Sequence, residues 1–153
     1  MSGEGSKPIG RITLRRRAIT TQPLLVWKNA FALGVNEIDE EHKHFFEIAN
    51  WLRSSILAGR TVAREALDKM AEHARCHFDH EEACLIAADC PYLPRHRGEH
   101  QRFVLALAHF DSQETPSAEG VFCLARDWIL DHILNTDILH KEWISKPPPL
   151  TPR

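Results

Sequence analysis

The 153-residue sequence lacks the features that mark several large classes of protein. No apolar run approaches the roughly 18–20 residues of a membrane-spanning helix, so no membrane span is expected. Lys and Arg number 19 against 21 Asp and Glu, and this balance gives no basic excess for binding nucleic acid. Residues 1–10 lack the apolar stretch of a signal peptide, and the cysteines form no CxxC pair: Cys76, Cys84, Cys90 and Cys123. These absences predict a cytoplasmic protein with reduced thiols.

The sequence has one tyrosine but ten histidines, and its prolines lie outside long uninterrupted stretches. Proline is excluded from helix interiors, and glycine is favoured just beyond a helix end. The proline positions and Gly59 therefore predict four helices, at roughly 37–58, 61–89, 95–112 and 117–145. Within each segment the apolar residues recur in steps of three and four, as in the seams of a left-handed bundle. The predicted fold is all-α, an antiparallel up-down four-helix bundle.

The two ends of the chain differ from this bundle, which is expected over residues 24–145. Residues 1–23 form a basic N-terminal arm, and residues 146–153, KPPPLTPR, form a proline-rich C-terminal tail. Both ends have the composition of solvated tails, although the arm could also dock on an acidic protein partner. Leu24–Phe31, which includes Trp27, is a candidate to fold back over the bundle.

Polar residues interrupt the seam of every predicted helix. They are His42 in the first, His77 and Glu81 in the second, His96 and His100 in the third and His132 in the fourth. A polar group buried without a partner costs roughly 2–7 kcal/mol, so six of them in one small core call for a shared ligand. His77 and Glu81, like His96 and His100, stand one helical turn apart, which is the spacing of a local metal chelate.

A set of histidines and carboxylates without cysteine suits iron, zinc, copper or manganese. Other histidines fall outside the seams and are not expected to be ligands. His73 and His80 lie to either side of the second seam, so they are expected at its flank or at the surface. His44, His109 and His140 are single and are interpreted as surface or packing residues.

Four segments of the sequence together resemble the hemerythrins, especially the single-domain bacterial proteins. They are GVNEIDEEH at 34–42, HFDHEE at 77–82, PYLPRHRGEHQRF at 91–103 and WILDHILNTD at 128–137, and the resemblance covers about residues 27–143. It implies a non-haem centre of two iron ions with an oxo or hydroxo bridge. Position by position, the implied iron ligands are His42, His77, Glu81, His96, His100, His132 and Asp137.

The resemblance, and not the periodicity, supplies Asp137. Five residues beyond His132 is about 140° away around a regular helix of 3.6 residues per turn. We therefore expect either a π-type distortion of the last helix or an Asp137 side chain that reaches round near the helix end. Two positions depart from the family pattern: Cys84-Leu85 stand where a Met is usual, and His140 stands where a Tyr is common.

The resemblance also implies that one iron is held by His96, His100 and His132, and that the other, held by His42 and His77, keeps an open position. Phe45, Phe103, Ile129 and Trp128 are expected to line an apolar pocket there. Because no acid, lysine or tyrosine remains on the seams as a proton donor, we expect reversible O2 binding for storage, delivery or sensing. The alternatives are a di-iron redox enzyme that reduces peroxide or nitric oxide, and a sensor that docks a partner through its N-terminal arm.

Overall fold

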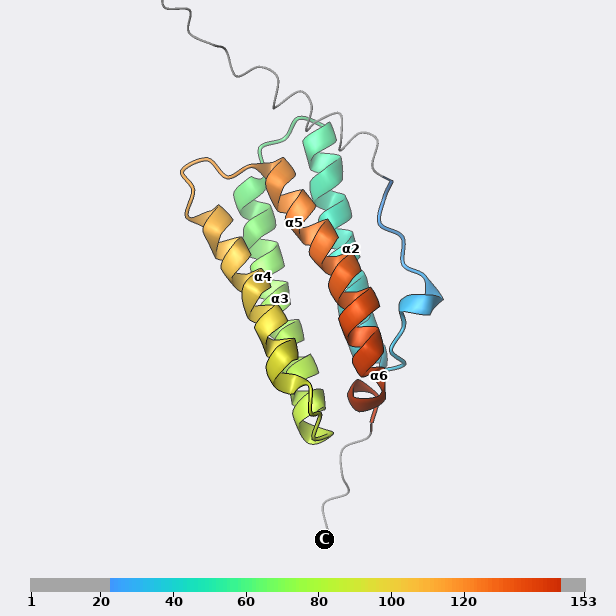
Figure 1. Cartoon of the computed structure of the whole chain (residues 1–153). Coiled ribbons are helices and arrows are strands. Elements are labelled where there is room, and N and C mark those ends of the chain that lie inside the picture. Colours follow the sequence, from blue (N-terminus) through green and yellow to red (C-terminus); the bar gives the residue numbers. More distant parts are fainter. Residues whose placement is uncertain (1–22, 147–153) are drawn as a thin grey trace, which may run out of the picture.

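The computed structural model describes residues 23–146, and in that range it is all-helical, as predicted (Figure 1). A short 3-10 turn, η1 (Asn29–Phe31), precedes three long helices, α2 (Asn36–Leu57), α3 (Ala63–Ala87) and α4 (Leu93–Asp111). The fourth rod of the bundle consists of α5 (Ala118–Asp131), η2 (His132–Asp137) and α6 (Ile138–Ile144). Short connections make successive rods antiparallel, and the four-helix bundle is confirmed. Within residues 23–146, no helix combines the length and the apolar character needed to span a bilayer.

The helix ends lie within about two residues of the predicted ones, and local chemistry explains them. Gly59 follows α2 with a φ of +72°, a left-handed conformation that favours glycine. Helix α4 begins at Leu93, two residues before the predicted start, with Pro94 in its first turn. Proline is tolerated there because the first N–H groups of a helix have no intrahelical acceptor.

The segment before α2 folds back over the bundle, as predicted for Leu24–Phe31. The amide N–H of Leu25 donates to Asn50 Oδ1 at 2.9 Å, and Asn50 Nδ2 donates to the Leu25 carbonyl at 2.8 Å. Trp27 and Phe31 pack against Phe46 of α2, with ring centroids 5.7 and 6.0 Å apart. The predicted arm and tail fall almost wholly on residues 1–22 and 147–153, which lie outside the described residues.

Two apolar clusters fill the bundle and leave a polar layer between them. The larger one includes Phe45 of α2 and Phe78 of α3 and continues towards the C-terminal end of α2 and the N-terminal end of α3. The smaller one, at the opposite end, contains Leu33, Ile38, Leu85, Cys90 and Ile144. The seam histidines lie between these clusters, so water is kept from them on both sides. All four cysteines are free.

The expected distortion of the last helix is confirmed. Residues His132–Asp137 form a π-helix between two α-helical segments. Its wider turn brings residues five apart onto one face, so His132 and Asp137 both point into the bundle, 2% and 0% exposed.

Candidate metal centre

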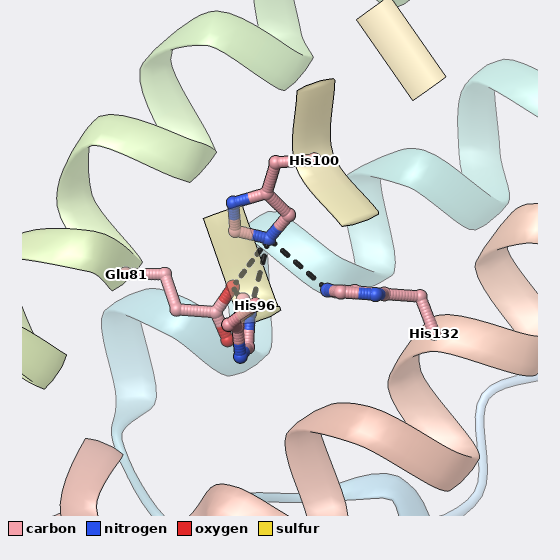
Figure 2. A group of neighbouring side chains, drawn as sticks. All are labelled: Glu81, His96, His100 and His132. Atoms are coloured by element: carbon pink, nitrogen blue, oxygen red, sulfur yellow. Dashed lines mark hydrogen bonds and ion pairs between the residues drawn. The ribbon is translucent and has the colours of Figure 1, made fainter. Parts of the chain in front are cut away.

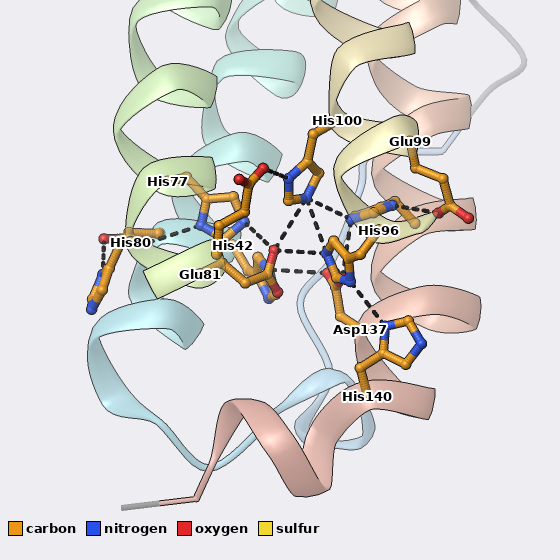
Figure 3. Close-up of polar contacts among 12 residues, drawn as sticks. His42, His77, His80, Glu81, His96, Glu99, His100, Asp137 and His140 are labelled. Carbon is orange, nitrogen blue, oxygen red and sulfur yellow. Dashed lines mark hydrogen bonds and ion pairs between the residues drawn. The ribbon is translucent and has the colours of Figure 1, made fainter. Parts of the chain in front are cut away.

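The polar layer brings together all seven residues that the sequence singled out. All are buried, with exposures of 2% or less: His42, His77, Glu81, His96, His100, His132 and Asp137. Helices α2, α3 and α4 supply the first five, and the π-helix supplies the last two. Figure 3 shows the side chains converging from all four rods of the bundle on one region of the core.

The side chains form two groups that could each hold a metal ion, and Glu81 belongs to both. The larger group comprises Glu81, His96, His100 and His132, whose side chains Figure 2 shows converging on one point. The smaller group comprises His42, His77 and Glu81. Three imidazoles therefore face one position and two face the other.

The two fully buried carboxylates, Glu81 and Asp137, lie between the two groups. Glu81 Oε2 is 3.2 Å from His96 Nε2 and 3.6 Å from His77 Nε2. Asp137 places Oδ1 3.1 Å from His132 Nε2 and Oδ2 3.3 Å from His42 Nε2. Each carboxylate thus reaches ligand candidates of both positions, which is the arrangement that a bridging ligand requires.

Outer carboxylates fix the orientation of three of the five imidazoles. The contacts are His77 Nδ1 with Glu41 at 2.9 Å, His100 Nδ1 with Glu82 at 2.9 Å and His132 Nδ1 with Glu99 at 3.1 Å. An ionised carboxylate can only accept, so each ring donates its Nδ1–H and directs Nε2 towards the centre of the cluster. Such outer partners orient the histidine ligands of metal sites in general.

These outer glutamates are ionised. Partial burial by itself would raise the pKa of Glu41, but hydrogen bonds from His77 and His80 outweigh burial and lower it. Side-chain hydrogen bonds likewise lower the pKa values of Glu82 and Glu99 against the effect of burial. The three carboxylates therefore remain acceptors at neutral pH.

The centre of the cluster is left short of positive charge. His100 Nε2 lies 3.1 Å from His96 Nε2 and 3.0 Å from His132 Nε2, close enough for lone pairs to face one another unless a proton or a metal ion intervenes. Several buried atoms have no hydrogen-bond partner among the described residues, including His42 Nε2, His77 Nε2, Glu81 Oε1 and both Asp137 oxygens. Because unpaired burial is costly, this donor set fits a pair of divalent cations.

Without metal, one ion pair supplies part of the missing charge. Burial by itself lowers the pKa of His132, but attraction to the Asp137 carboxylate outweighs it and raises the pKa to about 9. Burial and the charge of Glu81 would raise the pKa of Asp137, but His132 and His42 lower it to about 2. At neutral pH a cation arriving at His132 must therefore displace a proton. Burial lowers the pKa of His77 despite its contact with Glu41, so that imidazole is neutral and ready to bind.

Aromatic side chains cover the larger group on its outer side. Trp128 stacks on His132, with centroids 4.5 Å apart and planes at 14°, and Phe103 stacks on Trp128 at 4.2 Å. Phe78, which the sequence did not single out, stacks on His100 at 3.8 Å. An open groove of about 910 Å³ between α3 and α4 runs past Phe78 and His100.

Near the smaller group, Phe45 is fully buried, and its ring centroid is 5.3 Å from that of His77. Ile129 is also fully buried, in the larger apolar cluster. Of the side chains expected to form the pocket, Phe45 lies against the smaller group, whereas the partly buried Trp128 and its neighbour Phe103 lie beside His132 of the larger group.

The structure also places the histidines that the sequence set aside. His80 is 40% exposed and His44 is 53% exposed, and His73, which is partly buried, contacts the backbone carbonyl of Glu41. The expectation for His140 as a surface or packing residue was incomplete. It is 8% exposed, and its Nδ1 lies 2.9 Å from that of His96. The π-helix rotates α6 so that this residue turns inward, which a regular helical count does not reveal.

Comparisons with known proteins agree with this geometry. Residues 33–142 match the model of the hemerythrin HHE cation binding domain. A bacteriohemerythrin of Clostridium acetobutylicum is 29% identical over 74% of this chain and 96% of its own. A bacteriohemerythrin of Ralstonia nicotianae is 30% identical over 81% of this chain and 91% of its own. Myohemerythrin-1 of Phascolopsis gouldii is 29% identical over 76% of this chain and 91% of its own. No solved structure gives a significant match. The family model spans most of the chain, and the chain belongs to the hemerythrin family.

Proposed function

We propose that this protein binds O2 reversibly at a di-iron centre. The proposed ligands of one iron are His96, His100 and His132, those of the other are His42 and His77, and Glu81 and Asp137 are shared. The unequal division of the imidazoles carries the proposal, because the position with only two of them keeps room for an exogenous ligand. Two bound ferrous ions would supply the electrons and the open coordination position that reversible O2 binding needs.

The surrounding residues favour binding over further reduction of O2. Cleavage of the O–O bond requires protons, and the Phe45 side chain that packs on the His77 ring at the smaller group is apolar and fully buried. A dry wall of this kind also slows the entry of water. The protein would then serve in storage, delivery or sensing of O2, and a cytoplasmic location is part of the proposal.

A visible spectrum combined with metal analysis tests the proposal. The purified protein is reduced under anaerobic conditions and then exposed to O2. We expect two iron ions per chain and a colourless reduced form that gains colour on O2 addition and loses it on O2 removal. A single zinc ion, or no metal, would contradict the proposal.

The alternative function, reduction of peroxide or nitric oxide at the same centre, has one observation in its favour. His80 Nδ1 contacts Glu41 at 2.9 Å, and Glu41 contacts His77 Nδ1, so hydrogen bonds connect an exposed imidazole to a candidate ligand. Catalytic consumption of either substrate after rapid mixing, without stoichiometric O2 release, would favour this enzyme. Docking of a protein partner through residues 1–23 remains a hypothesis, and truncation followed by a pull-down tests it.

Replacing His77 with alanine is expected to abolish O2 binding, because it leaves His42 as the only imidazole of the smaller group. A Cys84→Ala variant is the control, since Cys84 is one turn from Glu81 on the same helix but belongs to neither group. O2 titration of both reduced proteins compares them. Equal O2 uptake by the two variants would contradict the assignment of His77.

An Ile129→Val variant is expected to autoxidise severalfold faster than the wild type. The smaller side chain opens the apolar wall and admits water to the site. Ile56→Val, at the other end of the same apolar cluster, removes an equal volume away from the metal position. Autoxidation is followed by the decay of the visible band. If both variants decay at the wild-type rate, Ile129 does not line the pocket.

A further inference from the structure

The contact between His96 and His140 differs in kind from the other outer contacts of the cluster. His140 lies on α6, 8% exposed, and stacks on Tyr92 with centroids 5.2 Å apart and planes at 6°. Its Nδ1 is 2.9 Å from His96 Nδ1, and Figure 3 shows its second nitrogen directed away from the cluster. Where His77, His100 and His132 each meet a carboxylate, His96 meets a second imidazole.

An imidazole nitrogen can either donate or accept a hydrogen bond, whereas an ionised carboxylate oxygen can only accept one. An ionised glutamate only accepts, so the three rings that face glutamates carry a proton on Nδ1 whether or not metal is bound. The Nδ1 of a neutral imidazole either donates or accepts, depending on which of its nitrogens carries the proton. The His96–His140 hydrogen bond can therefore run in either direction.

The two directions correspond to two states of the centre. Without metal, His96 Nε2–H can donate to Glu81 Oε2, 3.2 Å away, and His96 Nδ1 then accepts from His140 Nδ1–H. A metal ion on His96 Nε2 requires that nitrogen to be unprotonated. The remaining proton then lies on His96 Nδ1, which donates to His140 Nδ1.

We propose that His140 is a positioning residue that holds the His96 ring in the same orientation in the metal-free and the metal-bound protein, by reversing the direction of their hydrogen bond. On metal binding one proton leaves His96 Nε2, the shared proton moves from His140 Nδ1 to His96 Nδ1, and His140 Nε2 takes one proton from solvent. No net proton is taken up or released at this pair. The inference rests on the proposed role of His96 as a metal ligand.

Nitrogen NMR of protein labelled with ¹⁵N-histidine tests the reversal directly. The probe is Zn²⁺, which is diamagnetic and accepts nitrogen and oxygen ligands. We expect His140 to carry its proton on Nδ1 in the metal-free protein and on Nε2 after zinc loading. The same tautomer in both states would overturn the reversal alone. Failure of the wild-type chain to take up zinc would contradict the proposed metal function and overturn the reversal with it.

Two variants separate positioning from a general loss of packing. His140→Leu keeps an apolar side chain on α6 but removes the hydrogen bond, and we expect it to release zinc to a chelator about 10–100-fold faster than the wild type. His140→Asn carries an amide that can either donate or accept, and it should release zinc close to the wild-type rate. The control is His109→Leu, an exposed histidine of α4. Equal release rates for the Leu and Asn variants would overturn the proposal, because they would leave only packing to explain the effect.

Discussion

A Glu81→Gln variant is expected to hold no more than one metal ion per chain, whereas the proposed di-iron centre gives the wild type two. The Oε2 atom of Glu81 lies 3.2–3.6 Å from the Nε2 atoms of His77, His96 and His100, so one oxygen serves both groups. An amide is a weaker ligand than a carboxylate, and it supplies no negative charge to hold two cations side by side. We expect O2 binding to be lost with the second ion. Metal analysis after gel filtration measures the stoichiometry.

Two other glutamates, at increasing distance from the centre, provide graded controls for this variant. Glu82 contacts His100 only at Nδ1, so Glu82→Gln should retain both ions with about 10–100-fold lower affinity. Glu47, an exposed residue of α2 paired with His44, should tolerate glutamine without any change in metal content. Two tightly held ions in Glu81→Gln would show that this carboxylate does not bridge the two positions.

In the metal-free protein, an Asp137→Asn variant is expected to lose unfolding free energy near pH 6, by at most about 3 kcal/mol. Attraction to Asp137, with further contributions from Glu81 and Glu99, outweighs burial and raises the pKa of His132 from 6.5 to about 9, and each pKa unit corresponds to about 1.4 kcal/mol. When folding raises the pKa of a group, protonation of that group stabilises the fold. This stabilisation is complete at pH values below the pKa of the unfolded state. The stabilisation is lost as the pH rises from about 6.5 through 9, so the deficit of the variant should shrink over that range.

Acid acts on the same ion pair through Asp137, whose pKa is about 2 when folded against 3.8 unfolded. When folding lowers the pKa of a group, ionisation of that group stabilises the fold at pH values above the pKa of the unfolded state. The pair therefore persists until the pH falls from about 3.8 through 2. Chemical denaturation at a series of pH values measures the difference between variant and wild type. Asp131→Asn, an exposed change on the same rod, is the control. An NMR titration in which His132 keeps a pKa near 9 in Asp137→Asn would contradict the pairing.

Most of the candidate centre could be predicted from the sequence, because the bundle fixes which positions face inward. In a helix of 3.6 residues per turn, steps of three and four define one stripe, and polar residues on that stripe must be buried. His42, His77, Glu81, His96, His100 and His132 were found in this way, and all are buried. Asp137 required the family resemblance, because only a π-helical turn places it on the same face as His132.

The outer partners of the imidazoles could not be predicted in the same way. Glu41, Glu82 and Glu99 each stand next to a seam residue in sequence, which in a regular helix places them at the edge of the buried face. Their exposures of 27%, 20% and 17% agree with that position. A glutamate also need not contact the histidine next to it in sequence. Glu99 precedes His100 but contacts His132.

The sequence by itself thus determined the helices, their inward faces and the residue types that meet in the core, since these depend on local periodicity and on the cost of burying polar groups. Only the tertiary structure decided which side chains from different helices touch. The contacts of His96 with His140 and of His132 with Glu99 depend on how far each helix is rotated and shifted against its neighbours. A single extra residue in the π-helix changes that rotation for all of α6, and with it the partner of a candidate ligand.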